Sequence, residues 1–185
     1  MPKLKKILLS TEIDLYYLQN FLTDDECTEI LSCATVYDRS LTVNGIDDSR
    51  TSYSCTIDKY STITLGCITR RIAKILPIDV SNIEPYQVVR YESGQKFDAH
   101  YDWGKLSKIG DKQRQYTIFA YLNDVPNGGQ TVFPELGLEF APSRGSALLW
   151  RNCDDNKIGL TKNLHQGMPP IDCTKYGLNI WIDFP

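Results

Sequence analysis

The segment Glu84-Pro-Tyr-Gln-Val-Val-Arg-Tyr-Glu-Ser-Gly-Gln-Lys-Phe-Asp-Ala-His-Tyr-Asp102 marks a change of texture along the chain. It holds two short runs of β-type residues, Tyr86 to Tyr91 and Phe97 to Tyr101, separated by a turn that contains Gly94. Further short β-type runs follow it at 116–123, 131–133, 138–141, 146–150, 160–165 and 176–184. Short strands at this spacing, broken by turn residues, predict a double-stranded β-helix, or jelly roll.

The sequence before this segment predicts helices that cover a sheet. Thr23-Asp-Asp-Glu26 is a capping box, because the Thr and Glu side chains can each accept a hydrogen bond from the other's backbone N–H. It opens an amphipathic helix expected at about 24–36. A second helix is expected at about 61–76, where isoleucine and leucine recur at mostly helical spacing. Between the helices, Asn44-Gly45 favours a tight hairpin in a polar surface segment.

These patterns predict a mainly β fold with flanking helices (α+β), in which a jelly-roll core is covered by N-terminal helices. We expect one domain over residues 1–185, with a helical N-terminal part at about 1–80 and the jelly-roll core at about 84–185. A chain of 185 residues can bury roughly two-thirds of the surface that its unfolded form exposes. It does not need a metal ion to fold, so a metal site would call for a chemical explanation.

Charge and composition exclude several classes of partner. The chain has 20 Lys and Arg against 23 Asp and Glu and no basic stripe, which argues against a nucleic-acid partner. The apolar run Ile7 to Leu9 is too short for a secretory signal, and no longer run could span a bilayer. The six cysteines are irregularly spaced, without a Cys-x-x-Cys pair, as is typical of buried thiols in a reducing compartment. A cytoplasmic protein without a membrane or nucleic-acid partner is expected, and its oligomeric state stays open.

The two histidines of the chain, His100 and His165, stand in contexts that suggest metal binding. In His100-Tyr101-Asp102, on an expected strand, residues two apart point to the same face. If His165 on a later strand joins them, two imidazoles and one carboxylate form the facial triad of non-haem Fe(II) oxygenases, which leaves open positions for a cosubstrate and dioxygen. A lone His-x-Asp is also common in surface turns, so the motif needs support from elsewhere.

That support comes from Lys175, which opens the last expected strand. Lys175, Gly177, Asn179 and Trp181 share one face by the period of two residues. A solvated, outward-facing lysine is the commoner arrangement, but here it would also expose the indole of Trp181. If the face points inward, a buried ammonium group needs an anion. The sequence favours this second interpretation, with a dicarboxylate ligand as the anion.

From about Thr23 to Trp181 the chain resembles the collagen-type prolyl 4-hydroxylases, which depend on Fe(II) and 2-oxoglutarate. The resemblance is densest at 84–102, 114–134, 145–150 and 165–169, together with Lys175 and Trp181. It implies hydroxylation of proline in a peptide or protein, while 2-oxoglutarate is decarboxylated to succinate and carbon dioxide. It also implies dioxygen as second cosubstrate and ascorbate as reductant.

The resemblance further assigns roles to individual residues. His100, Asp102 and His165 would hold Fe(II), and Lys175 would bind the distal carboxylate of 2-oxoglutarate as part of the catalytic site. Tyr91 and Thr117 would donate hydroxyl hydrogen bonds beside that carboxylate, although plain packing is the commoner role of such strand residues. On the substrate side, Trp181 would form a wall beside the proline. Arg50 matches a substrate-side arginine on a mobile loop, with a solvated surface arginine as the alternative, and residues 40–58 would cover the peptide.

Several positions depart from the family pattern on the substrate side. Phe97 replaces a tyrosine, which removes a hydroxyl that would face the substrate. The stretch from Trp103 to Gln113 is shorter than its counterpart, and Cys173, Tyr176 and Leu178 replace a glycine, a tryptophan and an alanine. The resemblance therefore indicates the reaction class more directly than it indicates the substrate.

Three alternatives stay open at this point. The same chemistry could act on another residue such as lysine or on a folded protein. A jelly-roll binding module that has lost catalysis would explain the fold equally well. A nucleic-acid demethylase is disfavoured, because such enzymes ordinarily use arginine for the dicarboxylate and need a basic surface.

Overall fold

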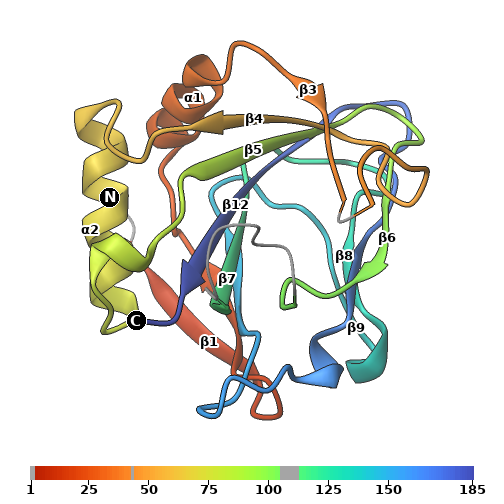
Figure 1. The fold of residues 1–185 in the computed structure, drawn as a ribbon. Coiled ribbons are helices and arrows are strands. Elements are labelled where there is room, and N and C mark those ends of the chain that lie inside the picture. Colours follow the sequence, from red (N-terminus) through yellow and green to blue (C-terminus); the bar gives the residue numbers. More distant parts are fainter. Residues whose placement is uncertain (1–2, 43, 105–112) are drawn as a thin grey trace.

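The computed structural model describes residues 3–42, 44–104 and 113–185, and this part of the chain folds into two antiparallel sheets with helices on one side (Figure 1). The helices are α1 (Asp24–Cys33), α2 (Ile63–Ile75) and the short 3-10 helices η1 (Val80–Asn82), η2 (Pro134–Leu136) and η3 (Thr161–Asn163). The strands are β1 (Lys5–Ser10), β2 (Leu15–Gln19), β3 (Asp38–Arg39), β4 (Tyr53–Ile57), β5 (Tyr86–Tyr91), β6 (Phe97–His100), β7 (Arg114–Tyr121), β8 (Thr131–Phe133), β9 (Leu138–Phe140), β10 (Ala147–Arg151), β11 (His165–Gly167) and β12 (Lys175–Asp183).

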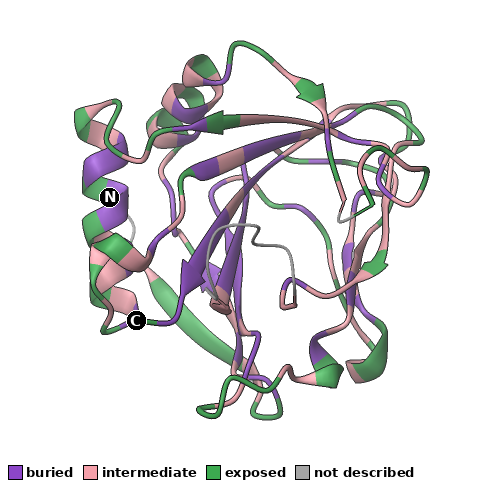
Figure 2. Cartoon of the chain, viewed as in Figure 1, coloured by how far each residue is buried: buried purple, intermediate pink, exposed green. Residues whose placement is uncertain are grey.

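The larger sheet has the order β1-β2-β10-β7-β12-β5-β4-β3, and the smaller has the order β6-β11-β8-β9. The central strands of the larger sheet are buried on both faces (Figure 2). In β5, Tyr86 and Val88 pack into the apolar cluster shared with α1 and α2, whereas Val89 and Tyr91 pack into a second cluster that faces the smaller sheet. This is the expected mainly β jelly roll with flanking helices.

The capping box and both expected helices are present. Glu26 N–H donates to Thr23 Oγ1 at 3.2 Å, and Thr23 N–H donates to Glu26 Oε2 at 2.9 Å. Helix α1 ends at Cys33, three residues before the expected end, and α2 lies within the expected range. Arg71 of α2 pairs with Glu26 at 2.6 Å, which joins the two helices over the sheet.

The N-terminal part differs from the expected helical region at about 1–80, because it also contributes four strands to the larger sheet. Strands β1 and β2 extend one edge through the pairing of β2 with β10, and β3 and β4 extend the other through β5. Strand β1 is largely solvent-facing, and β2 buries Leu15 and Leu18, three residues apart. Neither strand shows the alternation of buried apolar and exposed polar residues by which a strand is recognised in a sequence.

Local boundaries near the expected site also differ. Instead of a strand over 160–165, η3 precedes β11, which begins at His165. Strand β6 ends at His100, so Asp102 lies two residues beyond it. The hairpin at Asn44-Gly45 is present, since Thr42 and Gly45 exchange backbone hydrogen bonds and Gly45 has φ +91°. Of the shortened stretch Trp103 to Gln113, residues 105–112 lie outside the described residues.

No helix within the described ranges is long and apolar enough to cross a bilayer. The six cysteines are free thiols: Cys27 and Cys153 are buried, Cys67 is exposed, and the other three are partly buried, so the expectation of buried thiols is wrong for four of the six. The cytoplasmic location stays a prediction.

Candidate metal centre and active site

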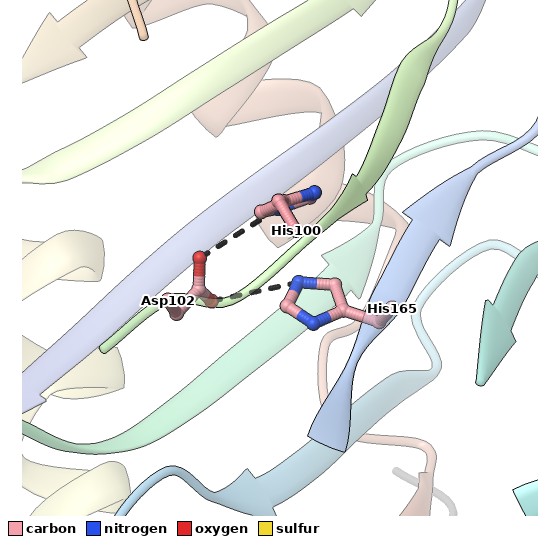
Figure 3. Close-up of side chains that lie close together, drawn as sticks. All are labelled: His100, Asp102 and His165. Atoms are coloured by element: carbon pink, nitrogen blue, oxygen red, sulfur yellow. Dashed lines mark ion pairs between the residues drawn. The ribbon is translucent and has the colours of Figure 1, made fainter. Parts of the chain in front are cut away.

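Adjacent strands of the smaller sheet bring the two histidines together, since β6 and β11 pair His100 directly with His165. The Asp102 carboxylate lies beside both rings, with Oδ1 3.8 Å from His100 Nε2 and Oδ2 3.8 Å from His165 Nε2. One ligand atom from each residue lies within 4.8 Å of the others. Figure 3 shows the carboxylate directed at the two imidazoles. The three expected ligands therefore converge.

The hydrogen bonds of the two imidazoles fix which nitrogen faces the centre. His100 Nδ1 lies 2.8 Å from the Asp98 carbonyl, and His165 Nδ1 lies 2.9 Å from the Asn163 carbonyl. Because a carbonyl only accepts, each Nδ1 carries a hydrogen, and Nε2 is the ring nitrogen that faces Asp102 and is placed to bind a metal ion.

Protonation states at the centre suit a metal ion. Burial lowers the pKa of His100 to about 3, with a further contribution from His165, so that the His100 imidazole is neutral near pH 7. Burial opposes ionisation of Asp102, but His165 and His100 outweigh it and lower the pKa of the carboxyl to about 2. A neutral imidazole and an anionic carboxylate thus lie side by side, an arrangement that a divalent cation stabilises. A two-histidine, one-carboxylate donor set fits Fe(II).

A partly open pocket adjoins the triad. Aromatic side chains and a few polar groups line it: Tyr91, Phe97, His100, Asp102, Phe119, Thr131, Trp150, His165, Gln166, Gly167, Lys175, Asn179 and Trp181. Its lining combines an apolar wall with convergent polar groups, as is usual for small-molecule sites.

Lys175 lies in this pocket with 1% of its surface exposed. Its Nζ is 5.2 to 5.7 Å from the ring centroids of Tyr91, Phe119 and Tyr121. None of the described residues gives this Nζ a carboxylate or a hydrogen-bond acceptor, and burial lowers the pKa of Lys175 to about 7. The ammonium group therefore requires an anionic ligand, as the shared face of β12 predicts.

The hydroxyl groups near Lys175 differ from those expected. Thr117 does not line the pocket; its Oγ1 donates to Asp102 Oδ2 at 2.8 Å, so its expected place beside the distal carboxylate is wrong. Thr131 lines the pocket instead. The Tyr121 hydroxyl donates to Thr131 Oγ1 at 2.9 Å, which leaves the Thr131 hydrogen free to be donated to a ligand. Tyr91 lines the pocket as expected.

The substrate-side residues form a stack beside the metal centre. Phe97 lies on the His100 imidazole, with ring centroids 3.4 Å apart, and the Arg50 guanidinium lies 4.6 Å from the centroid of Phe97. Arg50 is 6% exposed and donates to the Leu41 carbonyl and to Gln87, so it is not a solvated arginine. Its loop is tied to β6 by backbone hydrogen bonds, among them Asp98 N–H to Ser49 O at 2.7 Å.

Trp181 lies where the sequence places it, in the wall of the pocket. Sequence reasoning missed the residue behind it: the Arg114 guanidinium covers the indole at 3.7 Å and pairs with Glu84 at 2.7 Å. It also missed Asn152 and Asn163, which are fully buried near the triad. Buried asparagine carries no periodic signal, and Asn152 follows the charged Arg151 at the end of β10, where polar residues are ordinary.

Comparisons with known proteins agree with this geometry. Residues 86–183 match the model of the 2OG-Fe(II) oxygenase superfamily. The chain belongs to this superfamily. Prolyl 4-hydroxylase 2 of Arabidopsis thaliana is 30% identical over 97% of the chain and 70% of the plant protein. The prolyl 4-hydroxylase subunit alpha-1 of Gallus gallus is 31% identical over 82% of the chain and 31% of that subunit.

Among solved structures, a viral collagen prolyl hydroxylase from Paramecium Bursaria Chlorella virus-1, in complex with 2-oxoglutarate, has the same fold. It superposes with a TM-score of 0.78 and 26% identity, covering 92% of this chain and 96% of that one. The protein is thus an Fe(II)- and 2-oxoglutarate-dependent dioxygenase related to the collagen-type prolyl 4-hydroxylases. A binding module without catalysis is set aside.

We expect the buried Lys175 to make 2-oxoglutarate binding by this oxygenase dependent on pH. Below pH 7 the amine is already charged, whereas above pH 7 it must take up a proton to pair with the dicarboxylate. We expect the affinity of the Mn(II)-loaded protein for 2-oxoglutarate to fall by up to about tenfold per pH unit above 7, the limit for one linked proton. Calorimetry at pH 8 in two buffers of different ionisation enthalpy should show uptake of close to one proton. Binding without proton uptake would contradict the charge pairing.

Proposed function

We propose that this oxygenase is a prolyl 4-hydroxylase that acts on proline residues in peptides or proteins. The observation that carries the proposal is the pocket itself, in which the His100, Asp102 and His165 triad and the unpaired Lys175 adjoin aromatic walls of Phe97 and Trp181. The similarity to prolyl 4-hydroxylases over nearly the whole chain supports the choice of substrate.

Different residues of the pocket bind the cosubstrate and the substrate. Lys175 binds the distal carboxylate of 2-oxoglutarate, and the hydroxyls of Tyr91 and Thr131 donate to the same group. This fixes the dicarboxylate at one end, so that its keto acid end is oriented toward the triad. Bound Fe(II) supplies the oxidising chemistry with 2-oxoglutarate and dioxygen, and the protein supplies binding, orientation and exclusion of water.

A proline side chain suits the aromatic walls. Its ring is apolar and compact, and a proline-rich segment is partly preorganised as a polyproline II helix, which lowers the entropic cost of binding. Phe97 lacks the hydroxyl that a tyrosine would offer to the peptide. Gln166 and Asn179, which also line the pocket, are the groups that can bond to the peptide backbone.

Lysine hydroxylation is the second candidate, and Phe97 is the observation that favours it, since the family's tyrosine is absent. The charge behind Phe97 weighs against it. The Arg50 guanidinium covers Phe97 and bonds only to uncharged groups, so a cationic side chain would enter beside a positive group. The Arg114 guanidinium behind Trp181 is paired with Glu84 and adds little to this repulsion.

The test supplies Fe(II), 2-oxoglutarate and ascorbate with proline-rich peptides, and with matched peptides in which alanine replaces the central proline. We expect the first set alone to gain one oxygen atom, and acid hydrolysis followed by chromatography to yield 4-hydroxyproline. A second arm offers lysine-containing peptides and folded proteins. Steady succinate formation without hydroxyproline from any peptide would refute the proposed substrate while leaving the oxygenase chemistry intact.

A further inference from the structure

We propose that Asn152, Thr117 and Asn163 form a buried network that positions Asp102 and His165 for metal binding. All three residues have no exposed surface, and none of them lines the pocket. Their effect must therefore reach the reaction through the metal ligands and not through contact with substrate. The inference rests on the assigned metal site and not on which substrate is hydroxylated.

The first arm of the network holds the carboxylate. Asn152 Nδ2 donates to Thr117 Oγ1 at 2.8 Å, and Thr117 Oγ1 donates to Asp102 Oδ2 at 2.8 Å. The pairing of β10 with β7 sets Trp150 opposite Thr117, and Asn152 follows two residues later on the same side. Asp102 lies beyond the end of β6, so the backbone ladder does not fix it, and the side chain needs another constraint.

The direction of these hydrogen bonds is set by chemistry. An ionised carboxylate only accepts, so the single hydroxyl hydrogen of Thr117 must point at Asp102. The lone pairs of Thr117 then need a donor, and the amide nitrogen of Asn152 is one. Reversing the Asn152 amide would place its oxygen against those lone pairs. The chain of donors therefore orients one carboxylate oxygen and leaves Oδ1 toward His100.

The second arm connects this carboxylate to His165. Asn163 Nδ2 donates to the carbonyls of Arg151 and Asn152, both at 3.0 Å, which fixes the backbone that carries Asn152. Its Oδ1 accepts from Trp103 Nε1 at 3.2 Å, in the residue after Asp102. Its own carbonyl accepts from His165 Nδ1. One buried residue, through its side chain and its backbone carbonyl, thus ties together the segments of two metal ligands.

The test measures Co(II) binding by calorimetry and by its visible absorption, independently of turnover. Outer-shell partners of metal ligands typically contribute about 10–100-fold to metal affinity. We expect Thr117→Val to weaken Co(II) binding by that factor and Asn152→Leu, which keeps the size of the side chain, to weaken it about tenfold. The double variant should bind Co(II) no more weakly than Thr117→Val alone, because Asn152 acts on Asp102 through Thr117. Both single variants should alter the shape of the Co(II) absorption band.

Two controls separate positioning from stability. Thr117→Ser keeps the hydroxyl and should bind Co(II) as the original protein does. Thr69→Val removes a hydroxyl that is equally buried but bonds to Tyr86 at 2.7 Å under the helices, so it should lower Tm without changing Co(II) affinity. If Thr117→Val does not fold, Asn152→Leu and Thr117→Ser still test the link. Unchanged Co(II) affinity and spectrum in folded Thr117→Val or Asn152→Leu, or additive losses in the double variant, would overturn the proposal.

Discussion

Replacing His100 with alanine is expected to remove tight Fe(II) binding and, with it, 2-oxoglutarate decarboxylation. The variant keeps only His165 and Asp102 at the centre, and the loss of a direct ligand should exceed the about 10–100-fold loss of affinity that outer-shell changes cause. Anaerobic titration with Fe(II) and 2-oxoglutarate measures this as the loss of the visible charge-transfer band. The fold should persist, because the chain does not need a metal ion to form its core.

Asp98→Ala is the matched control for this variant. Asp98 lies on the same strand two residues earlier, but its carboxylate points to Lys96 at 2.7 Å and is half exposed. The hydrogen bond to His100 comes from the Asp98 carbonyl, which the substitution leaves in place. This variant should keep the charge-transfer band. An intact band in His100→Ala, or equal losses in both variants, would show that the triad is not the iron site.

The sequence predicts the features that depend on strand periodicity. Lys175 and Trp181 share a face of β12, and both are buried in one pocket, because β12 runs unbroken over this distance and its first register shift comes after Ile182. The capping box at Thr23 is likewise a local pattern, and the structure contains it. Strand alternation and capping patterns are predictable from sequence because each of them lies within a single element.

Features that depend on contacts between strands could not be predicted from the sequence. Thr117 and Thr131 are both strand threonines, and only the register of β7 against β10 and the bend after β6 decide which hydroxyl meets Asp102 and which faces the pocket. Arg50 was expected on a mobile loop. In the structure it is held by hydrogen bonds to Leu41 and Gln87, which are 9 and 37 residues away in the sequence, so no local pattern predicts them. Strand β1 is too exposed to show a buried face.

Replacing Lys175 with methionine is expected to have opposite effects on ligand binding and on stability. Removing one partner of a buried charge pair costs roughly 2–5 kcal/mol, so the affinity for 2-oxoglutarate should fall by about 30- to 4,000-fold. Metal affinity should change little, because Lys175 is not among the three ligands. Calorimetry on the Mn(II)-loaded variant measures both quantities, with exposed Lys74→Met as the control.

Stability of the ligand-free protein should rise in the same variant. Folding lowers the pKa of Lys175 from its ordinary 10.5 to about 7, so the unfolded state binds more protons between these values and the free energy of unfolding rises with pH there. The cost of burying the charge is therefore fully present below pH 7 and fades toward pH 10.5. Methionine removes that cost. Urea unfolding should therefore show a larger increase in the free energy of unfolding at pH 6 than at pH 9. If Lys175 instead stabilised the fold, its replacement would lower the free energy of unfolding at both pH values, because it would leave a packing defect without removing an unfavourable buried charge.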